Sequence, residues 1–292
     1  MPLFPLRLLA GLFLLGLASS PVRAADSATA SAPELTLRVM AYNVRYASDR
    51  PPNAWPDRRP AMKRLLEKEA PDLIGTQEGV YGQVRDLAAD LPAYDWIGLG
   101  RDGGTRGEFM AVFYRRDRFE PLAFDHFWLS DTPQVIASTS WGNRLPRMVT
   151  WVRFRDRSTG RVFEFWNTHF DHQSEPARQQ SAVLLRDRIA GIPADIPVVV
   201  TGDFNAVAGA SAAYTTLTAD GALTDTWLAA KVRHNEGINT FNSFGVGRRE
   251  GQRIDWVLAR QPKGVDEAAI VIDDDNGVPP SDHYPVTATI RF

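Results

Sequence analysis

Eight polar residues stand at the ends of apolar, strand-like segments that are spread over most of the chain. They are carboxylates, carboxamides and imidazoles: Asn43, Glu78, His169, Asp203, Asn205, Asp255, Asp282 and His283. In the segment VVVTGDFN, a valine run typical of a strand buried on both faces leads directly to Asp203 and Asn205. A buried carboxylate without a partner is costly, so we expect these acids to be solvated, hydrogen-bonded or bound to a cation.

The residue types favour a hard divalent cation. Carboxylate and amide oxygens suit Mg²⁺, Mn²⁺ or Ca²⁺, whereas a zinc site would need more imidazole in clustered spacing. A cation beside a histidine–aspartate pair can hydrolyse a phosphate ester, because the cation offsets the phosphate charge and stabilises the leaving oxygen while the histidine takes a proton from water.

Each residue also has an explanation that involves no chemistry. Asn43 fits a turn, Glu78 an exposed or helix-capping position, and Asp203 a turn in which its side chain bonds the following backbone. His283 fits a satisfied core histidine, whereas Asp255 within an apolar run is harder to explain without a donor. Their joint occurrence at the ends of predicted central strands, where open α/β sheets place ligand sites, favours one shared site.

The segments that carry these residues predict an α/β domain in which strands alternate with helices. The helical spacing of Ala182, Leu185 and Ile189 predicts a helix that begins at Glu175, and another helix is predicted over residues 57–70. Strands are predicted over residues 36–46, 71–79, 109–116, 148–156, 162–170, 198–201, 253–260 and 284–292. No internal repeat or linker divides this body, which has the length of one large domain.

At these positions the chain resembles the endonuclease/exonuclease/phosphatase superfamily, which includes deoxyribonuclease I, apurinic endonucleases, sphingomyelinases and inositol polyphosphate 5-phosphatases. The motifs QE, NTH, GDFN, RIDW and SDH occur in family order at residues 77–78, 167–169, 202–205, 253–256 and 281–283. The resemblance to a secreted bacterial member implies a deoxyribonuclease I-like fold. This fold is a four-layer α/β sandwich, with two mixed β-sheets packed face to face and helices on the outside.

The resemblance also implies a cation site and a proton-transfer pair. Glu78 is expected to be the principal ligand of Mg²⁺ or Mn²⁺, with Asn43 and Asp282 in support. His283 is expected to be the general base or its equivalent, and Asp255 the acid that orients it.

Other residues are expected to bind phosphate. By the same resemblance, Asp203 and Asn205 would position the attacking water and the phosphate, and Asp203 is a rival to His283 as the base. His169 would donate to a non-bridging phosphate oxygen.

Three further residues are candidates for substrate binding. Arg147 would bind phosphate through its planar fork, with a surface ion pair as the alternative. Asp171 and His172 extend NTHFDH beyond the family motif and would line the site. The glycine-rich segment 101–108 lacks the spacing of a nucleotide-binding loop, and we expect a mobile surface loop there.

The first 24 residues have the pattern of a secretory signal peptide, with an apolar core too short to span a membrane and small residues before the cleavage site. We expect a disordered lead-in over residues 25–33 and a catalytic domain over residues 34–292. The chain contains no cysteine, so it forms no disulfide. Export to the periplasm or the exterior is compatible with this composition.

The sequence therefore predicts a secreted, divalent-metal-dependent phosphoesterase. The chain carries a formal charge of −2, and removal of the leader with Arg7 and Arg23 would change this to −4, so nucleic acid is not the favoured substrate. A small soluble phosphoester is favoured, with extracellular nuclease and sphingomyelinase-like phosphodiesterase as alternatives. A phospholigand-binding protein on the same fold is the non-enzyme alternative. No transmembrane segment and no protein partner are evident.

Overall fold

The computed structural model describes residues 1–2, 33–245, 250–272 and 279–292. The signal peptide predicted over residues 1–24 and nearly all of the lead-in predicted over residues 25–33 lie outside the described residues, apart from the first two residues and Pro33. Within the described ranges, no helix has both the length and the hydrophobicity needed to cross a membrane.

Two mixed β-sheets form the centre of the domain. The first sheet has the strand order β12-β14-β15-β1-β2-β6-β4, with bounds β1 (Thr36–Asn43), β2 (Leu73–Gln77), β4 (Tyr94–Ile97), β6 (Val112–Arg115), β12 (Ala230–His234), β14 (Gly264–Ile270) and β15 (Val286–Arg291). The second has the order β11-β13-β10-β9-β8-β7, with bounds β7 (Phe119–Trp128), β8 (Met148–Asp156), β9 (Val162–His169), β10 (Val198–Asp203), β11 (Thr224–Asp225) and β13 (Asp255–Arg260).

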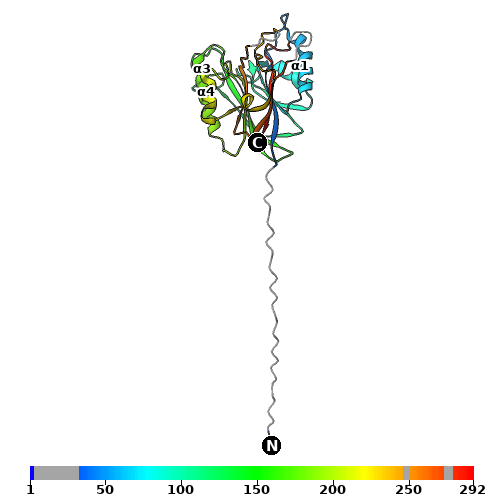
Figure 1. Ribbon diagram of the computed structural model, residues 1–292, viewed down its shortest axis with the longest axis vertical. Coiled ribbons are helices and arrows are strands. Elements are labelled where there is room, and N and C mark those ends of the chain that lie inside the picture. The colour runs from blue at the N-terminus through cyan, green and yellow to red at the C-terminus, as the bar shows by residue number, and fades with distance from the viewer. Residues whose placement is uncertain (3–32, 246–249, 273–278) are drawn as a thin grey trace. The chain divides into compact units, whose positions relative to one another are not determined.

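Helices cover the outer faces of both sheets. Residues of α1 (Trp55–Glu69) and α2 (Tyr81–Asp90) share an apolar cluster with the first sheet, and residues of α3 (Glu175–Ala190) and α4 (Ala212–Thr218) share another with the second. A third cluster lies between the sheets. Figure 1 shows α1 on one side of the sheets and α3 and α4 on the other. The predicted four-layer sandwich is therefore confirmed.

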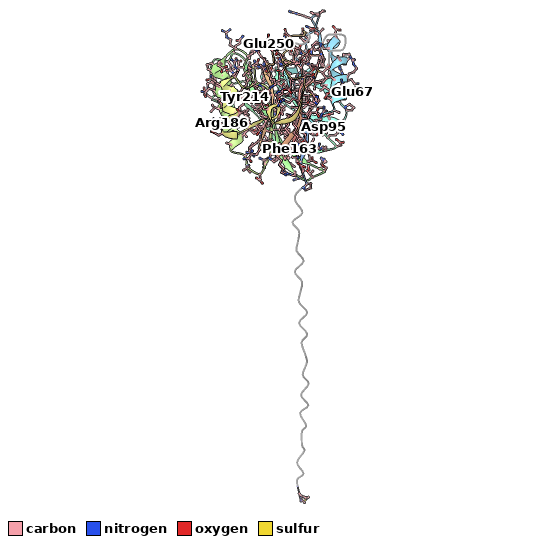
Figure 2. All side chains as sticks on the ribbon, viewed as in Figure 1. Glu67, Asp95, Phe163, Arg186, Tyr214 and Glu250 are labelled. Atoms are coloured by element: carbon pink, nitrogen blue, oxygen red, sulfur yellow. The ribbon has the colours of Figure 1, made fainter. Side chains whose placement is uncertain are left out.

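Charged side chains mark the outer surfaces of the helical layers. Glu67 of α1 and Arg186 of α3 lie on opposite sides of the domain (Figure 2) and keep 51% and 38% of their side-chain areas exposed. Met62, Leu65 and Leu66 form the apolar face of α1, which is buried against the first sheet. The helix thus separates apolar and charged side chains as its sequence pattern requires.

The valine run forms β10, and its side chains alternate between two cores. Val199 belongs to the core between the sheets, whereas Val198 and Val200 pack on the side of α3 and α4. β10 pairs in parallel with β9 and antiparallel with β13, which places Asp203 opposite both His169 and Asp255. Burial on both faces explains the apolar sequence, and the strand end explains the acid that follows it.

A close approach between the sheets requires glycine at position 75. A β-carbon at Gly75 of β2 would overlap Thr201 Oγ1 of β10 and lie 2.6 Å from Asn167 Oδ1 of β9. Asn167 Oδ1 also accepts a hydrogen bond of 2.7 Å from Gln77 Nε2. These contacts fix the two sheets together next to the strand ends where the predicted site residues lie.

Several predicted boundaries are wrong. The strand predicted over residues 109–116 is two strands, because β5 (Glu108–Phe109) pairs with β3 (Gly79–Val80) while β6 pairs with β2 and β4. The strand predicted over residues 36–46 ends at Asn43. Two residues later, Arg45 has a φ of 52°, which is incompatible with extended backbone.

The short elements between β10 and β13 complete the fold. They are the 3₁₀ turn η1 (Ala219–Gly221) and the short helix α5 (Thr226–Ala229), which lie between α4 and the edge strand β12. The helix α5 contacts β11 and β13 of the second sheet and β14 of the first.

Candidate active site

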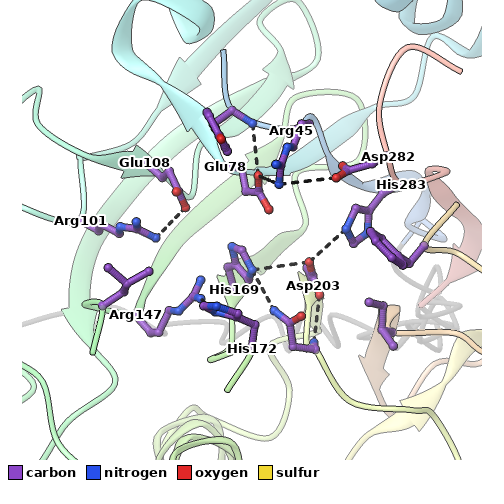
Figure 3. A pocket seen from close by; sticks show the side chains of 15 residues that line it. Arg45, Glu78, Arg101, Glu108, Arg147, His169, His172, Asp203, Asp282 and His283 are labelled. Atoms are coloured by element: carbon purple, nitrogen blue, oxygen red, sulfur yellow. Dashed lines mark hydrogen bonds and ion pairs between the residues drawn. The ribbon is translucent and has the colours of Figure 1, made fainter. Parts of the chain in front are cut away.

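Loops and strand ends of both sheets meet in a pocket of about 320 Å³. Eight of the eleven residues proposed from the sequence line it: Glu78, Arg147, His169, His172, Asp203, Asn205, Asp282 and His283. The other three contact lining residues from behind: Asn43, Asp171 and Asp255. Figure 3 shows His169 at the centre, with Glu78 and Asp282 on one side and Arg147 and His172 on another. The structure therefore brings all eleven together.

Asn43, the last residue of β1, connects the two sheets beneath the pocket. Its Nδ2 donates to Glu78 Oε1 at 2.9 Å and to Asp203 Oδ2 at 2.9 Å, and lies 3.4 Å from His283 Nε2. Its Oδ1 accepts a hydrogen bond of 3.0 Å from the backbone N–H of Arg45. The side chain is fully buried, so one carboxamide holds three chemically active groups in fixed positions.

Asp203 is the buried carboxylate at the end of the valine strand. Its Oδ1 accepts a hydrogen bond of 2.9 Å from Asn205 N, and Oδ2 faces Asn43. Burial, reinforced by the negative charge of Asp255, raises the pKa of Asp203 to about 7, although His283 opposes the shift. The sequence predicts that this acid needs a partner, and the structure provides two hydrogen-bond donors and an imidazole.

His283 and Asp255 form a buried pair. His283 Nδ1 lies 2.9 Å from Asp255 Oδ2, and His283 Nε2 lies 3.7 Å from Asp203 Oδ2. Burial alone would lower the pKa of His283, but the carboxylates of Asp255 and Asp203 outweigh it and raise that pKa to about 10. Asp255 thus fixes the imidazole ring of His283, and the Nε2 atom of this ring faces the pocket and Asp203.

His169 and Asn205 present polar atoms on the neighbouring wall. Asn205 Nδ2 lies 3.0 Å from His169 Nε2, which is itself 3.5 Å from Asp203 Oδ2. Burial, followed by the positive charges of Arg147 and Arg101, lowers the pKa of His169 well below its ordinary value. His169 is therefore a neutral imidazole at neutral pH, and its buried Nδ1 has no hydrogen-bond partner within the described part of the chain.

Glu78 and Asp282 form an acidic wall beside Arg45. Glu78 directly follows β2. Its backbone has a φ of 65°, in the left-handed region, and this sparsely populated conformation is compatible with a functional constraint. Arg45 Nη1 lies 3.5 Å from Glu78 Oε2 and 3.5 Å from Asp282 Oδ2. Burial raises the pKa of Asp282, His283 opposes the shift, and the charge of Glu78 adds to it.

Arg58 of α1 fixes the loops that carry this acidic wall. Its Nη1 donates to the carbonyl oxygens of Val44 at 3.0 Å and Pro280 at 2.7 Å, and its Nη2 donates to that of Arg45 at 3.0 Å. The side chain is only 4% exposed. One guanidinium thus joins the loop after β1 to the segment that contains Asp282.

Two arginines form the opposite end of the pocket. Arg147, which is 4% exposed, has Nη2 2.8 Å from His172 Nδ1 and Nε 3.5 Å from Asp171 Oδ2. Arg101 donates from Nη1 to Glu108 Oε2 at 2.6 Å. We call Arg101, Arg147 and His172 the basic end of the pocket.

The prediction of a surface loop over residues 101–108 is wrong at both ends. Arg101 is only 9% exposed, and both Arg101 and Glu108 line the pocket. Pairing of β5 with β3 draws Glu108 toward the strand end of β2, and a bridge between Gly100 and Phe109 closes the loop. The glycines gave the segment the composition of a surface loop, whereas its charged ends face the site.

A family model described as the Endonuclease/Exonuclease/phosphatase family matches residues 40–283, which include the residues of the pocket. The chain belongs to this family.

Solved structures agree with this assignment. An endonuclease/exonuclease/phosphatase family protein from Bacteroides thetaiotaomicron has a TM-score of 0.84 and 33% identity, with 90% of this chain and 97% of that chain covered. A mannosyl-6-phosphatase from the same species has a TM-score of 0.81 and 34% identity, with 88% and 100% covered. TDP2 of D. rerio, solved with a single-strand DNA product, shares the fold at 16% identity and a TM-score of 0.66, with 87% and 98% covered.

A curated relative comes from Acanthamoeba polyphaga mimivirus, the uncharacterized protein L388. It is 31% identical over 160 residues, which are 52% of this chain and 59% of the viral protein. The chain therefore matches little more than half the length of that relative.

The donor atoms of the family site fit a divalent cation. Ligand atoms of Glu78, His169 and Asp203 lie within 4.8 Å of one another. Asp282 Oδ1 is buried without a hydrogen-bond partner among the described residues, and Arg45 lies between the carboxylates of Glu78 and Asp282. Hard oxygen atoms dominate this set, as Mg²⁺ and Mn²⁺ require.

Sequence reasoning missed seven lining residues of the pocket. Arg45 and Tyr46 directly follow Asn43, and their position was a usable signal. Ile254 lies within the RIDW motif, and the others come from loops or apolar segments with no chemical signature: Arg101, Glu108, Leu145 and Phe241. Their role depends on how the loops fold over the strand ends, which the family motifs do not encode.

Proposed function

We propose that this family member is a divalent-metal-dependent phosphoesterase that hydrolyses a small soluble phosphoester. The observation that carries the proposal is the continuous chain of contacts from Glu78 through Asn43 and Asp203 to His283 and Asp255. It joins a carboxylate suited to a cation with a buried acid–imidazole pair suited to proton transfer. A protein that only bound a phosphorylated ligand would have no use for this pair.

Glu78, Asp282 and Asn43 would hold Mg²⁺ or Mn²⁺. The bound cation would supply positive charge to the phosphate and to the leaving oxygen. Support comes from Asp282 Oδ1, which has no hydrogen-bond partner among the described residues, and from the two carboxylates that share Arg45.

The Asp203–His283 pair would accept the proton of the attacking water. The water oxygen forms a bond to phosphorus, the bond between phosphorus and the leaving oxygen breaks, and the leaving alkoxide takes up the proton that the pair accepted, which regenerates the pair. Asp203 Oδ2 and His283 Nε2 are 3.7 Å apart and interact strongly, so their titration belongs to the pair rather than to either residue. Asp255 holds the imidazole in orientation and stabilises its positive charge.

His169 and Asn205 would bind non-bridging phosphate oxygens. His169 is neutral, because burial and the nearby arginines lower its pKa, and its Nε2, which accepts a hydrogen bond from Asn205 Nδ2 in this structure, would donate to the phosphate once that carboxamide turns toward the phosphate as well. The carboxamide of Asn205 lies beside it, and the left-handed backbone of Asn205, with a φ of 47°, directs the side chain toward the pocket wall.

A sugar phosphate is the substrate class that we favour. The pocket of about 320 Å³ suits a small molecule, and Tyr46, Leu145 and Phe241 on its lining are 36–40% exposed. Apolar side chains beside a polar centre can pack against the C–H face of a sugar ring. The relative described as a mannosyl-6-phosphatase, at 34% identity, supports the same class.

Export is part of the proposal. The charged start, short apolar core and small residues near Ala24 support cleavage after residue 24. N-terminal sequencing of the protein secreted by a Gram-negative host checks this point. A mature protein that still begins at Met1 would contradict it.

A substrate panel tests the enzymatic proposal. The purified protein is incubated with hexose 6-phosphates, bis-p-nitrophenyl phosphate, DNA and sphingomyelin, with Mg²⁺ or Mn²⁺ and then with EDTA. We expect cation-dependent release of phosphate from sugar phosphates, lost with EDTA and reduced by roughly 10²-fold or more in Glu78→Gln.

Glu67→Gln is the matched control, because Glu67 is an exposed carboxylate on α1. Its activity should equal that of the unaltered chain. Phosphate binding without turnover of any member of the panel would favour the ligand-binding alternative and defeat the enzymatic proposal.

A further inference from the structure

We propose that the basic end of the pocket, Arg101, Arg147 and His172, selects the dianion of a phosphomonoester over a phosphodiester. This inference rests on the proposed phosphoesterase function and specifies the ester class on which it acts. Figure 3 shows Arg101 and Arg147 on the side of His169 that lies away from Asp203 and His283.

Arg147 has unused donors at the pocket. A guanidinium carries five N–H groups, and those of Arg147 that have a described partner reach only His172 Nδ1 at 2.8 Å and, as an ion pair, Asp171 Oδ2 at 3.5 Å. Its buried Nε faces Asp171 Oδ2 behind the pocket, so the donors offered to the pocket are the N–H groups of Nη1 and Nη2 that His172 does not accept from, on a side chain that is 4% exposed. A buried guanidinium that lines a pocket with free donors is suited to an anion.

An acidic residue behind Arg147 fixes the position of its guanidinium. Asp171 Oδ1 accepts hydrogen bonds from Gln173 N at 2.9 Å and Ser174 N at 2.6 Å, so its other oxygen is left to face Arg147. Asp171 does not line the pocket. The cavity therefore meets the guanidinium of Arg147 rather than the carboxylate that balances it.

Unlike Arg147, Arg101 is held by a carboxylate that itself lines the pocket. Its Nη1 donates to Glu108 Oε2 at 2.6 Å, and its carbonyl oxygen accepts a hydrogen bond of 2.7 Å from Trp128 Nε1. Its Nε is buried and has no hydrogen-bond partner in the described part of the chain. Two fixed guanidinium groups thus line one end of the pocket.

The number of charged oxygens distinguishes the two ester classes. A monoester presents three non-bridging oxygens and up to two negative charges, whereas a diester presents two such oxygens and one charge. His169 and Asn205, together with the cation held by Glu78, Asp282 and Asn43, would bind two of these non-bridging oxygens. A third oxygen would meet the basic end, where a diester would instead place an uncharged ester group and leave buried donors unpaired.

Two substrates with the same leaving group test this selection. The ratio of kcat/KM for p-nitrophenyl phosphate to that for methyl p-nitrophenyl phosphate is measured with saturating Mg²⁺ in the unaltered chain, R147Q and R101Q. We expect the unaltered chain to prefer the monoester and each substitution to lower the ratio by about tenfold or more. Arg186→Gln, which removes an exposed arginine of α3, should leave the ratio unchanged.

A binding measurement gives a second readout. Calorimetric titration with inorganic phosphate in the presence of Mg²⁺ should show a Kd about tenfold weaker in R147Q than in Arg186→Gln. Circular dichroism establishes that each variant is folded. If R147Q does not fold, R147K takes its place, because it keeps the charge but loses the planar fork and should lower the ratio by a smaller factor.

The outcomes separate this inference from the proposed function. No cation-dependent hydrolysis of either ester by the unaltered chain would defeat the proposed function. Two results would overturn the proposed selection by the basic end and leave the proposed function intact. One is hydrolysis with a preference for the diester, and the other is an equal loss of kcat/KM for both esters in R147Q and R101Q.

Discussion

Several charged side chains on the pocket wall are held by a second side chain that stands behind them or beside them. Asp255 holds His283 at 2.9 Å, and Glu108 holds Arg101 at 2.6 Å. Such support keeps a group within hydrogen-bonding geometry before the substrate arrives, which reduces the reorganisation needed during reaction. At the scale of single residues, the pocket is therefore built from supported pairs.

The pair of Arg101 and Glu108 gives a pH prediction. Burial raises the pKa of Glu108 to about 7, although Arg101 opposes the shift. The folded state therefore binds a proton more readily than the unfolded state, so Glu108 should make the protein less stable as pH rises from about 4.5 to about 7. Glu108→Gln should remove this contribution, which is at most about 3 kcal/mol.

Urea unfolding at pH 5 and pH 8 measures the effect. The free energy of unfolding of the unaltered chain relative to Glu108→Gln should be smaller at pH 8 than at pH 5. Glu67→Gln corrects for the loss of one negative charge at an exposed position. A relative stability that is equal at the two pH values, or larger at pH 8, would contradict the raised pKa.

The strands place the site residues by their register. β9, β10 and β13 bring His169, Asp203 and Asp255 into one row, because Asp203 pairs with both of the others. For Asn43 of the first sheet to reach Asp203 of the second, the two sheets must lie at a fixed distance from each other. Gly75 of β2 sets that distance, since it faces Thr201 and Asn167 of the second sheet without a side chain between them.

Gly75→Ala should therefore lower the free energy of unfolding by about 2 kcal/mol or more, because the added β-carbon overlaps Thr201 Oγ1. Gly82→Ala in α2 is the matched control, because a β-carbon there meets nothing within 4 Å and alanine favours a helix. Urea unfolding should show the control to be as stable as the unaltered chain or slightly more so. Equal stability of Gly75→Ala and the control would contradict the close contact of the sheets.

The sequence predicts the elements that carry strong patterns and misses those that do not. The valine run, the strand over residues 148–156 and the helix from Glu175 agree with β10, β8 and α3. The edge strand β7 was missed because apolar side chains such as Leu122 and Phe124 lie exposed at its centre, so no apolar–polar alternation marks it, and because Pro121 lies next to an irregularity in its pairing. β14 was missed because GVDEAAI mixes acids into a strand that also contains a bulge.

At the scale of the whole molecule, the site is divided between the two sheets. Glu78, Asn43 and Asp282 belong to strand ends or loops of the first sheet, and His169, Asp203 and Asp255 to the second. The motifs predicted these residues because strand ends converge wherever two such sheets pack face to face. They did not predict Arg101 or Phe241, because loop conformation depends on tertiary contacts that short motifs do not specify.

A cation that binds the acidic wall should stabilise the whole domain, because it binds the folded arrangement and not the separated loops. At a concentration about one hundredfold above its Kd, Mg²⁺ or Mn²⁺ should raise the free energy of unfolding by about 2–3 kcal/mol. Thermal and urea unfolding with the cation and with EDTA measure this difference. Glu78→Gln should lose most of it, whereas Glu67→Gln should keep it, since Glu67 lies on the exposed face of α1. Equal stabilisation of both variants would place the cation elsewhere on the protein and separate Glu78 from metal binding.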